Sequence, residues 1–136
     1  MRVFLDANIL FSAAKSAGAV RELLIRARAS GLELCADAYV VEEARRNLLL
    51  KESGAVDCLA EILATIEVGR FHPAPLPARI AALVPSNDRP VLAAAVRMGC
   101  QVLLTGDRTH FGPLYGKEVL GVVVHSPRSL AEWRQL

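Results

Sequence analysis

Short apolar runs alternate with longer amphipathic stretches along the whole chain of 136 residues. Runs of aliphatic and β-branched residues between polar residues or glycine are typical of buried strands, and they predict strands at 2–5, 32–36, 101–105 and 116–124. Apolar residues at helical spacing, bounded by capping and helix-breaking residues, predict helices at 7–14, 19–29, 38–51, 55–66, 78–84, 88–98 and 127–134. Since strands and helices alternate without a linker, we expect a single α/β domain over residues 1–136, a three-layer α/β/α sandwich with a four- or five-stranded parallel sheet.

The composition is that of a folded domain. Hydrophobic residues make up 53% of the chain and charged residues 22%, which argues against disorder. No apolar stretch approaches the roughly 18 residues of a membrane-spanning helix, and the first predicted strand leaves no room for a signal peptide, so we expect no membrane association and a cytoplasmic location. The formal net charge of +2 neither requires nor excludes nucleic acid as a partner. Cys35, Cys58 and Cys100 are far apart, and we expect buried reduced thiols rather than metal ligands or disulfides.

Two aspartates follow predicted strands. Asp6 comes directly after the first strand, and Asp107 follows Thr105 and a glycine after a later one. Parallel strands deliver their carboxyl ends to one crevice, where two nearby carboxylates repel each other unless a proton or a metal ion lies between them. The alternatives are structural, since aspartate also caps helices and forms turns. The placement favours a divalent-metal site, with Asn8 near enough in the sequence to hold Asp6.

Two further acids belong to predicted helices. Asp88 opens a helix, where capping is the structural alternative. Another helix offers the adjacent pair Glu42 and Glu43. Glu42 shares a face with Arg45 and Arg46, which is typical of a solvated ion-pair face, whereas Glu43 lies beside the apolar stripe. We therefore expect Glu43 to be the one that points inward.

Five short segments follow one another in an order that is more informative than any one of them. They are 5–10 (LDANIL), 43–48 (EARRNL), 88–95 (DRPVLAAA), 104–108 (LTGDR) and 122–130 (VVVHSPRSL). Together they resemble the PIN-domain ribonuclease family, and the resemblance covers the whole chain. It implies a doubly wound fold, cleavage of single-stranded RNA with Mg²⁺ or Mn²⁺, and frequent occurrence as the VapC-type toxin of a bacterial toxin–antitoxin pair.

The resemblance also implies roles for individual residues. The metal-site acids would be Asp6, Glu43, Asp88 and Asp107. Asn8 and Thr105 would be supporting polar residues. Many relatives carry a further acid three residues after the position of Asp107, where this chain has His110. This departure leaves open whether the site holds one metal ion or two.

The residue types suit phosphodiester hydrolysis. Mg²⁺ prefers carboxylate oxygen and keeps several waters when only one or two carboxylates bind it directly. A water on the cation loses a proton more readily and can attack the phosphate, whose developing charge the cation offsets. Arg89 and Arg108 each follow a site aspartate and could contact phosphate, although a solvated arginine is the common alternative. His72, His110 and His125 have no ligand spacing, and we expect them to be structural or to support the site.

Two other classes of function stay open. A catalytically degraded PIN-like domain would bind RNA or protein without cleaving, and the histidine at position 110 keeps that alternative available. A doubly wound domain could also bind a nucleotide, but the chain has no glycine-rich phosphate loop.

The sequence also predicts that the chain associates with another protein chain. The helix at 55–66, together with Leu48, Leu49 and Leu50, carries more apolar residues than one small sheet face would cover. This predicts a homodimer or a groove for an antitoxin, unless all of these residues belong to the core.

Overall fold

A mostly parallel sheet organises the computed structural model, which describes residues 1–73 and 75–136, without the side chains of residues 109 and 110. Within that part of the chain the sheet has six strands in the order β3-β2-β1-β4-β6-β5. They are β1 (Arg2–Leu5), β2 (Glu33–Asp37), β3 (Glu67–Gly69), β4 (Val102–Leu104), β5 (Glu118–Val119) and β6 (Val122–His125). All neighbouring strands are parallel except β5, which pairs antiparallel with β6.

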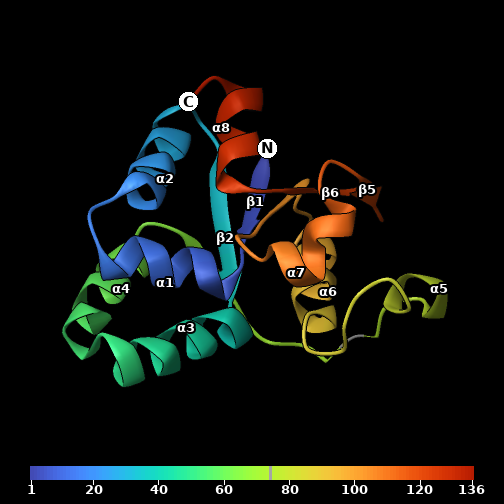
Figure 1. The fold of residues 1–136 in the computed structure, drawn as a ribbon, viewed down its shortest axis with the longest axis horizontal. Coiled ribbons are helices and arrows are strands. Elements are labelled where there is room, and N and C mark those ends of the chain that lie inside the picture. The colour runs from blue at the N-terminus through green and yellow to red at the C-terminus, as the bar shows by residue number, and fades with distance from the viewer. Residues whose placement is uncertain (74) are drawn as a thin grey trace.

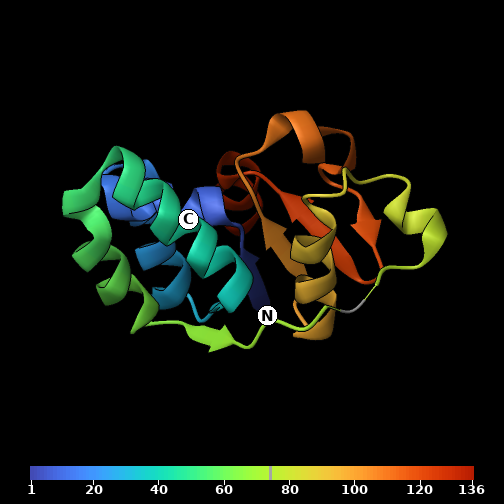
Figure 2. The same ribbon diagram turned by 90° about the horizontal axis from the view of Figure 1, so that it is seen from below.

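Helices cover both faces of this sheet. They are α1 (Ala7–Lys15), α2 (Ala19–Ala29), α3 (Ala38–Lys51), α4 (Val56–Leu63), α5 (Ala78–Ala81), α6 (Arg89–Arg97), α7 (Arg108–Phe111) and α8 (Pro127–Arg134), with 3₁₀ turns at Ser53–Ala55 and Gly112–Leu114. The crossovers from β1 to β2 and from β2 to β3 step one way along the sheet, and the crossover from β3 to β4 steps back. Because parallel crossovers are right-handed, α1 to α4 lie on one side of the strands and α6 on the other (Figures 1 and 2). The predicted three-layer sandwich is confirmed.

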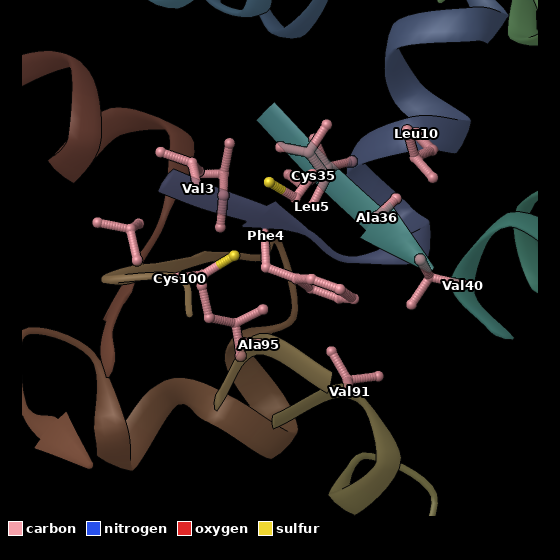
Figure 3. Packing of buried hydrophobic residues seen from close by; sticks show 14 of the residues in the cluster. Val3, Phe4, Leu5, Leu10, Cys35, Ala36, Val40, Val91, Ala95 and Cys100 are labelled. Carbon is pink, nitrogen blue, oxygen red and sulfur yellow. The ribbon is translucent and has the colours of Figure 1, made fainter. Parts of the chain in front are cut away.

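The first strand is buried on both faces. Val3, Phe4 and Leu5 have no exposed surface, which explains why these three successive residues of β1 are all apolar rather than alternating with polar residues. The ring of Phe4 points toward Val91 and Ala95 of α6 (Figure 3). This packing fixes the position of β1, whose carboxyl end leads into the predicted site.

Two strands differ from the prediction because pairing, rather than local sequence, makes them. β3 was not predicted: it has only three residues, and it is a strand because it pairs with β2 in the register Cys35↔Glu67. The strand predicted at 116–124 is instead β5 and β6, separated by a turn at Leu120 and Gly121. These two residues have φ values of 52° and 82°, which suits a two-residue hairpin turn. The sheet thus has six strands rather than four or five.

The helices follow the prediction more closely. Two predicted helices are shorter, ending at Leu63 and Ala81, and α7 was not predicted. Of the apolar residues expected to exceed the core, Leu59 is buried at 1% exposure, whereas Leu50 is 79% exposed. None of the helices in the described ranges is long and apolar enough to cross a membrane.

Candidate functional site

The carboxyl ends of β1 and β4 open into a cleft of about 340 Å³. All four predicted acids line it: Asp6 follows β1, Glu43 lies on α3, Asp88 precedes α6, and Asp107 follows β4. The structure therefore brings together side chains from four separate segments, as expected for acids at the carboxyl edge of a doubly wound sheet.

Asp6 is the most enclosed of these acids, with 4% of its surface exposed. Its Oδ1 accepts a hydrogen bond from the backbone N–H of Ala7 at 2.7 Å, so Asp6 also caps α1. Its Oδ2 accepts a hydrogen bond from the hydroxyl of Thr105 at 2.8 Å and a longer one from the Asn8 amide at 3.3 Å. The capping role and the site role thus coexist, because the two carboxylate oxygens have different partners.

Thr105 and Asn8 connect the ends of β1 and β4. Thr105 is fully buried, and its hydroxyl oxygen accepts hydrogen bonds from the backbone N–H of Asp107 at 3.1 Å and from the Asn8 amide at 3.3 Å. The side-chain oxygen of Asn8 accepts from the backbone N–H of Gly106 at 2.8 Å. The phenol of Tyr115 donates to the carbonyl of Thr105 at 3.1 Å. The two predicted supporting residues are therefore placed to orient Asp6 and the loop that carries Asp107.

The electrostatics of the cleft disfavour a negative charge on Asp6. Burial raises the pKa of Asp6, and repulsion from Glu43 and Asp107 raises it further, while hydrogen bonds from Thr105 and Ala7 oppose the shift. Carboxylates whose pKa is perturbed by burial and by like charges in a cleft are typical of functional sites. A cation in the cleft would instead favour the negatively charged form of Asp6.

The two adjacent glutamates of α3 separate as expected. Glu42 is exposed and lies 3.2 Å from a terminal nitrogen of Arg45, whereas Glu43 is half-buried and lines the cleft. Asp88 takes the N-cap position of α6, but within the described residues its side chain makes no capping hydrogen bond to that helix. Capping alone therefore does not explain Asp88.

Another buried acid has a structural explanation. Asp37 is fully buried, caps α3 by accepting from the backbone N–H of Val40, and lies 3.5 Å from a terminal nitrogen of Arg97. Its charge is thus compensated inside the fold, and Asp37 does not line the cleft. The contrast shows that burial by itself does not mark the site.

The donor set fits a hard divalent cation. The acids offer only oxygen ligands, which Mg²⁺ and Mn²⁺ accept. Over the described ranges, no three acidic, histidine or cysteine side chains are close enough together to enclose an ion. Mg²⁺ bound directly by one or two carboxylates keeps waters in its other positions.

The two arginines predicted as phosphate contacts are placed outside the lining of this cleft. The Nε of Arg89 donates to the backbone carbonyls of Ala81 and Val84 at 2.9 Å each, so this arginine holds the end of α5. Arg108 is exposed at the start of α7. For Arg89 the structural alternative is the better description, because its Nε is used inside the fold.

The three histidines lie in different parts of the structure. His125 stacks on Trp133 with ring centroids 5.1 Å apart, its Nδ1 lies 2.9 Å from the Ser129 hydroxyl, and burial lowers its pKa, all of which fit the expected structural role. His72 is exposed in the loop before α5. The side chain of His110 lies outside the described residues, so the departure at this position stays a sequence observation.

Further residues of the cleft were not singled out from the sequence. They are Ala7, Phe11, Asn47, Lys51 and Asn87. A signal was present for part of this set, because Glu43, Asn47 and Lys51 are spaced by four residues and so share one face of α3.

Comparisons with known proteins agree with this architecture. The solved structure of VapBC2 from Rickettsia felis, bound to a promoter DNA fragment, is similar with a TM-score of 0.62 and 15% identity over 93% of this chain and 98% of that one. VapC20 of Mycobacterium tuberculosis, described as a sarcin–ricin loop cleaving toxin, has a TM-score of 0.58 and 16% identity over 79% and 91%. FitAB bound to a DNA fragment has a TM-score of 0.58 and 17% identity over 92% and 94%. At these identities the likeness concerns the fold.

No curated protein sequence matches the chain. The sequence model of the PIN domain, in contrast, matches residues 2–109, which include all four acids of the cleft. The chain therefore belongs to the PIN domain family.

Proposed function

We propose that this protein is an endoribonuclease that cleaves phosphodiesters of single-stranded RNA with Mg²⁺ or Mn²⁺. The observation that carries the proposal is the convergence of Asp6, Glu43, Asp88 and Asp107 on one cleft. A purely structural role does not account for it, since burial, together with repulsion from Glu43 and Asp107, raises the pKa of Asp6 and disfavours its charged form. A cation bound in the cleft would favour the charged form of Asp6.

The four acids would hold the cation between them, one or two of them directly. When bound, it would offset charge on the phosphodiester and make a coordinated water a better nucleophile. The chain's own residues prepare this arrangement. The Thr105 hydroxyl keeps one oxygen of Asp6 oriented, and the backbone N–H of Ala7 keeps the other, so the carboxylate cannot rotate freely. Such fixed orientation reduces the reorganisation needed when substrate and ion bind.

The same proposal includes partners. Because the family resemblance implies a VapC-type toxin, and one similar structure is described as a toxin, we propose a cytoplasmic toxin neutralised by its own antitoxin protein. Leu49 and Leu50, 53% and 79% exposed on the last turn of α3, would contribute to a homodimer or to the antitoxin contact. Light scattering of the purified chain and recovery of the partner encoded next to it would test both; a monomer with no partner would contradict them.

Cleavage of labelled RNA is the direct test. Purified protein should cleave an unstructured RNA in Mg²⁺ or Mn²⁺, lose that activity in excess chelator, and regain it when the metal is restored. Asp6→Asn should be inactive, and Glu42→Gln, at the exposed neighbour of Glu43, should be active. Unchanged cleavage in chelator would refute the metal requirement. Binding of RNA without cleavage of any tested sequence would favour the alternative of a catalytically degraded binding module.

A further inference from the structure

The cleft that contains the acids continues between two helices. α1 and α3 begin at the carboxyl ends of β1 and β2, capped by Asp6 and Asp37, and run away from the sheet next to each other (Figure 1). The lining of the cleft includes Phe11 from α1 and Asn47 and Lys51 from α3. The acids therefore occupy the sheet end of a groove whose other end is formed by the last turns of the same two helices.

The charge changes sign along this groove. On α3, Glu43, Asn47 and Lys51 follow one another at intervals of four residues and line the same cleft. Eight residues of helix separate the glutamate from the lysine, which corresponds to about 12 Å along the axis. α1 repeats the pattern, with Asn8 near the sheet, Phe11 next and Lys15 in the last turn. Acids suited to a cation thus lie at one end, and ammonium groups suited to an anion lie at the other.

Two ammonium groups converge on one aromatic ring. The Nζ of Lys15 lies 5.9 Å and the Nζ of Lys51 lies 5.8 Å from the centroid of Phe11, although the two lysines come from different helices. Both side chains are exposed, and among the ion pairs of the described residues neither lysine has a carboxylate partner. A lysine in the last turn of a helix is also favoured by the helix dipole, but that preference does not explain why both meet at one ring inside the cleft. The ring face offsets part of their repulsion, and an anion between them would offset more.

We propose that Phe11, Lys15 and Lys51 form a subsite for the RNA strand a few nucleotides away from the cleaved bond, in which the ammonium groups bind a backbone phosphate and the ring contacts the adjoining nucleotide. The subsite rests on the proposed ribonuclease function and deepens it. A basic groove that also presents an aromatic ring is the usual way to hold a single strand without reading its sequence. Since stacked nucleotides rise about 3.4 Å each, 12 Å places the bound phosphate about three to four nucleotides from the acids, and fewer for an extended strand.

RNA binding in chelator separates this subsite from catalysis. Fluorescence anisotropy of a labelled single-stranded RNA, measured over a series of salt concentrations, gives both the Kd and its salt dependence. Lys15→Gln and Lys51→Gln should each weaken binding roughly three- to tenfold and reduce the slope of log K against log salt by about 0.7, the contribution of one phosphate contact on a single strand. Lys51→Arg should keep the slope of the parent. Phe11→Leu should weaken binding without changing the slope, because the ring carries no charge.

A matched lysine provides the control. Lys117 is exposed next to β5, at the edge of the sheet away from the groove, so Lys117→Gln should keep the Kd and slope of the parent. The stabilisation of each lysine variant by Mn²⁺ should equal that of the parent, which shows that the acids are intact.

The outcomes distinguish the two proposals. If the parent neither binds nor cleaves single-stranded RNA, the ribonuclease proposal fails. If the parent binds and cleaves RNA while Lys15→Gln and Lys51→Gln keep its Kd and slope, only the subsite is wrong. Loss of binding to a poly-glutamate peptide, with RNA binding unchanged, would overturn the subsite in favour of an acidic protein segment in the groove.

Discussion

Glu43→Gln should make the metal-free protein more stable while removing its response to metal. Glu43 is half-buried in the cleft and, of the neighbouring carboxylates, contributes most to raising the pKa of Asp6. The amide keeps the shape of the side chain and has nearly the same helix propensity, so the change removes mainly a negative charge. The metal-free fold then loses one unfavourable interaction, and the proposed metal site loses one of its acids.

The size of the effect follows from the charges. Two unit charges repel by about 4 kcal/mol at 4 Å and an effective dielectric constant near 20, and greater separation, partial exposure and salt reduce this to about 0.5–1 kcal/mol. For a chain of this length, that corresponds to a rise of about 2–4 °C in the Tm. Glu42→Gln is the matched control. Glu42 is exposed and paired with Arg45, so its neutralisation should lower the free energy of unfolding by at most about 0.5 kcal/mol.

Thermal unfolding of the parent and both variants, in chelator and then in Mn²⁺, measures the change in stability without metal and the stabilisation by metal. In chelator, Glu43→Gln should unfold above the parent and Glu42→Gln at or slightly below it. In Mn²⁺, the parent and Glu42→Gln should gain stability, whereas Glu43→Gln should gain much less. The reasoning is refuted if Glu43→Gln is less stable than Glu42→Gln in chelator, or if it keeps the full stabilisation by Mn²⁺.

Three further predictions follow from the same contacts. Thr105→Val removes the buried hydroxyl that donates to Asp6 and accepts from the N–H of Asp107, so chemical denaturation should show a loss of about 1–3 kcal/mol; an unchanged midpoint would contradict this network. Burial raises the pKa of Asp6, so the folded chain binds this proton more tightly than the unfolded chain. Protonation of Asp6 therefore stabilises the fold below the unfolded pKa near 3.9, and this stabilisation is lost as pH rises through the pKa of the folded chain. The stability of Asp6→Asn should not show this loss with rising pH, and identical pH profiles of the two metal-free proteins would contradict the prediction. Arg97→Met leaves the buried charge of Asp37 without its partner and should cost about 2–4 kcal/mol in urea unfolding, whereas a cost below about 1 kcal/mol would mean that the ion pair does not matter.

Most helices were predictable because their signals are local. The predicted ranges 19–29, 38–51 and 127–134 agree with α2, α3 and α8. Two of these helices start at a side-chain cap, Asp37 for α3 and Ser126 for α8. A cap and the backbone group it binds lie within four residues of each other, so a short window of sequence contains the whole interaction.

The strands were predictable only where they are buried. β4 is apolar throughout and β1 is apolar after Arg2, and their sequence was sufficient to identify them. β3 has no such pattern, and its strand conformation depends on pairing with β2, whose residues are about thirty positions away. The hairpin between β5 and β6 needed two residues with positive φ, one of which, Leu120, is not a residue type that signals such a turn.

The candidate site also has one part that was predictable from the sequence and another that only the tertiary structure decided. The sequence identified the four acids, because strand ends, a helix start and the order of short motifs are all properties of the chain read in one direction. That these acids meet was decided by the sheet order, which places β1 beside β4 and brings Asp6 within 2.8 Å of Thr105, 99 residues later. The meeting of Lys15 and Lys51 at Phe11 was decided by the packing of α1 against α3. The physical reason is that a helix satisfies its hydrogen bonds within four residues, whereas a parallel sheet and a groove between helices join residues whose separation along the chain is unrelated to their distance in space.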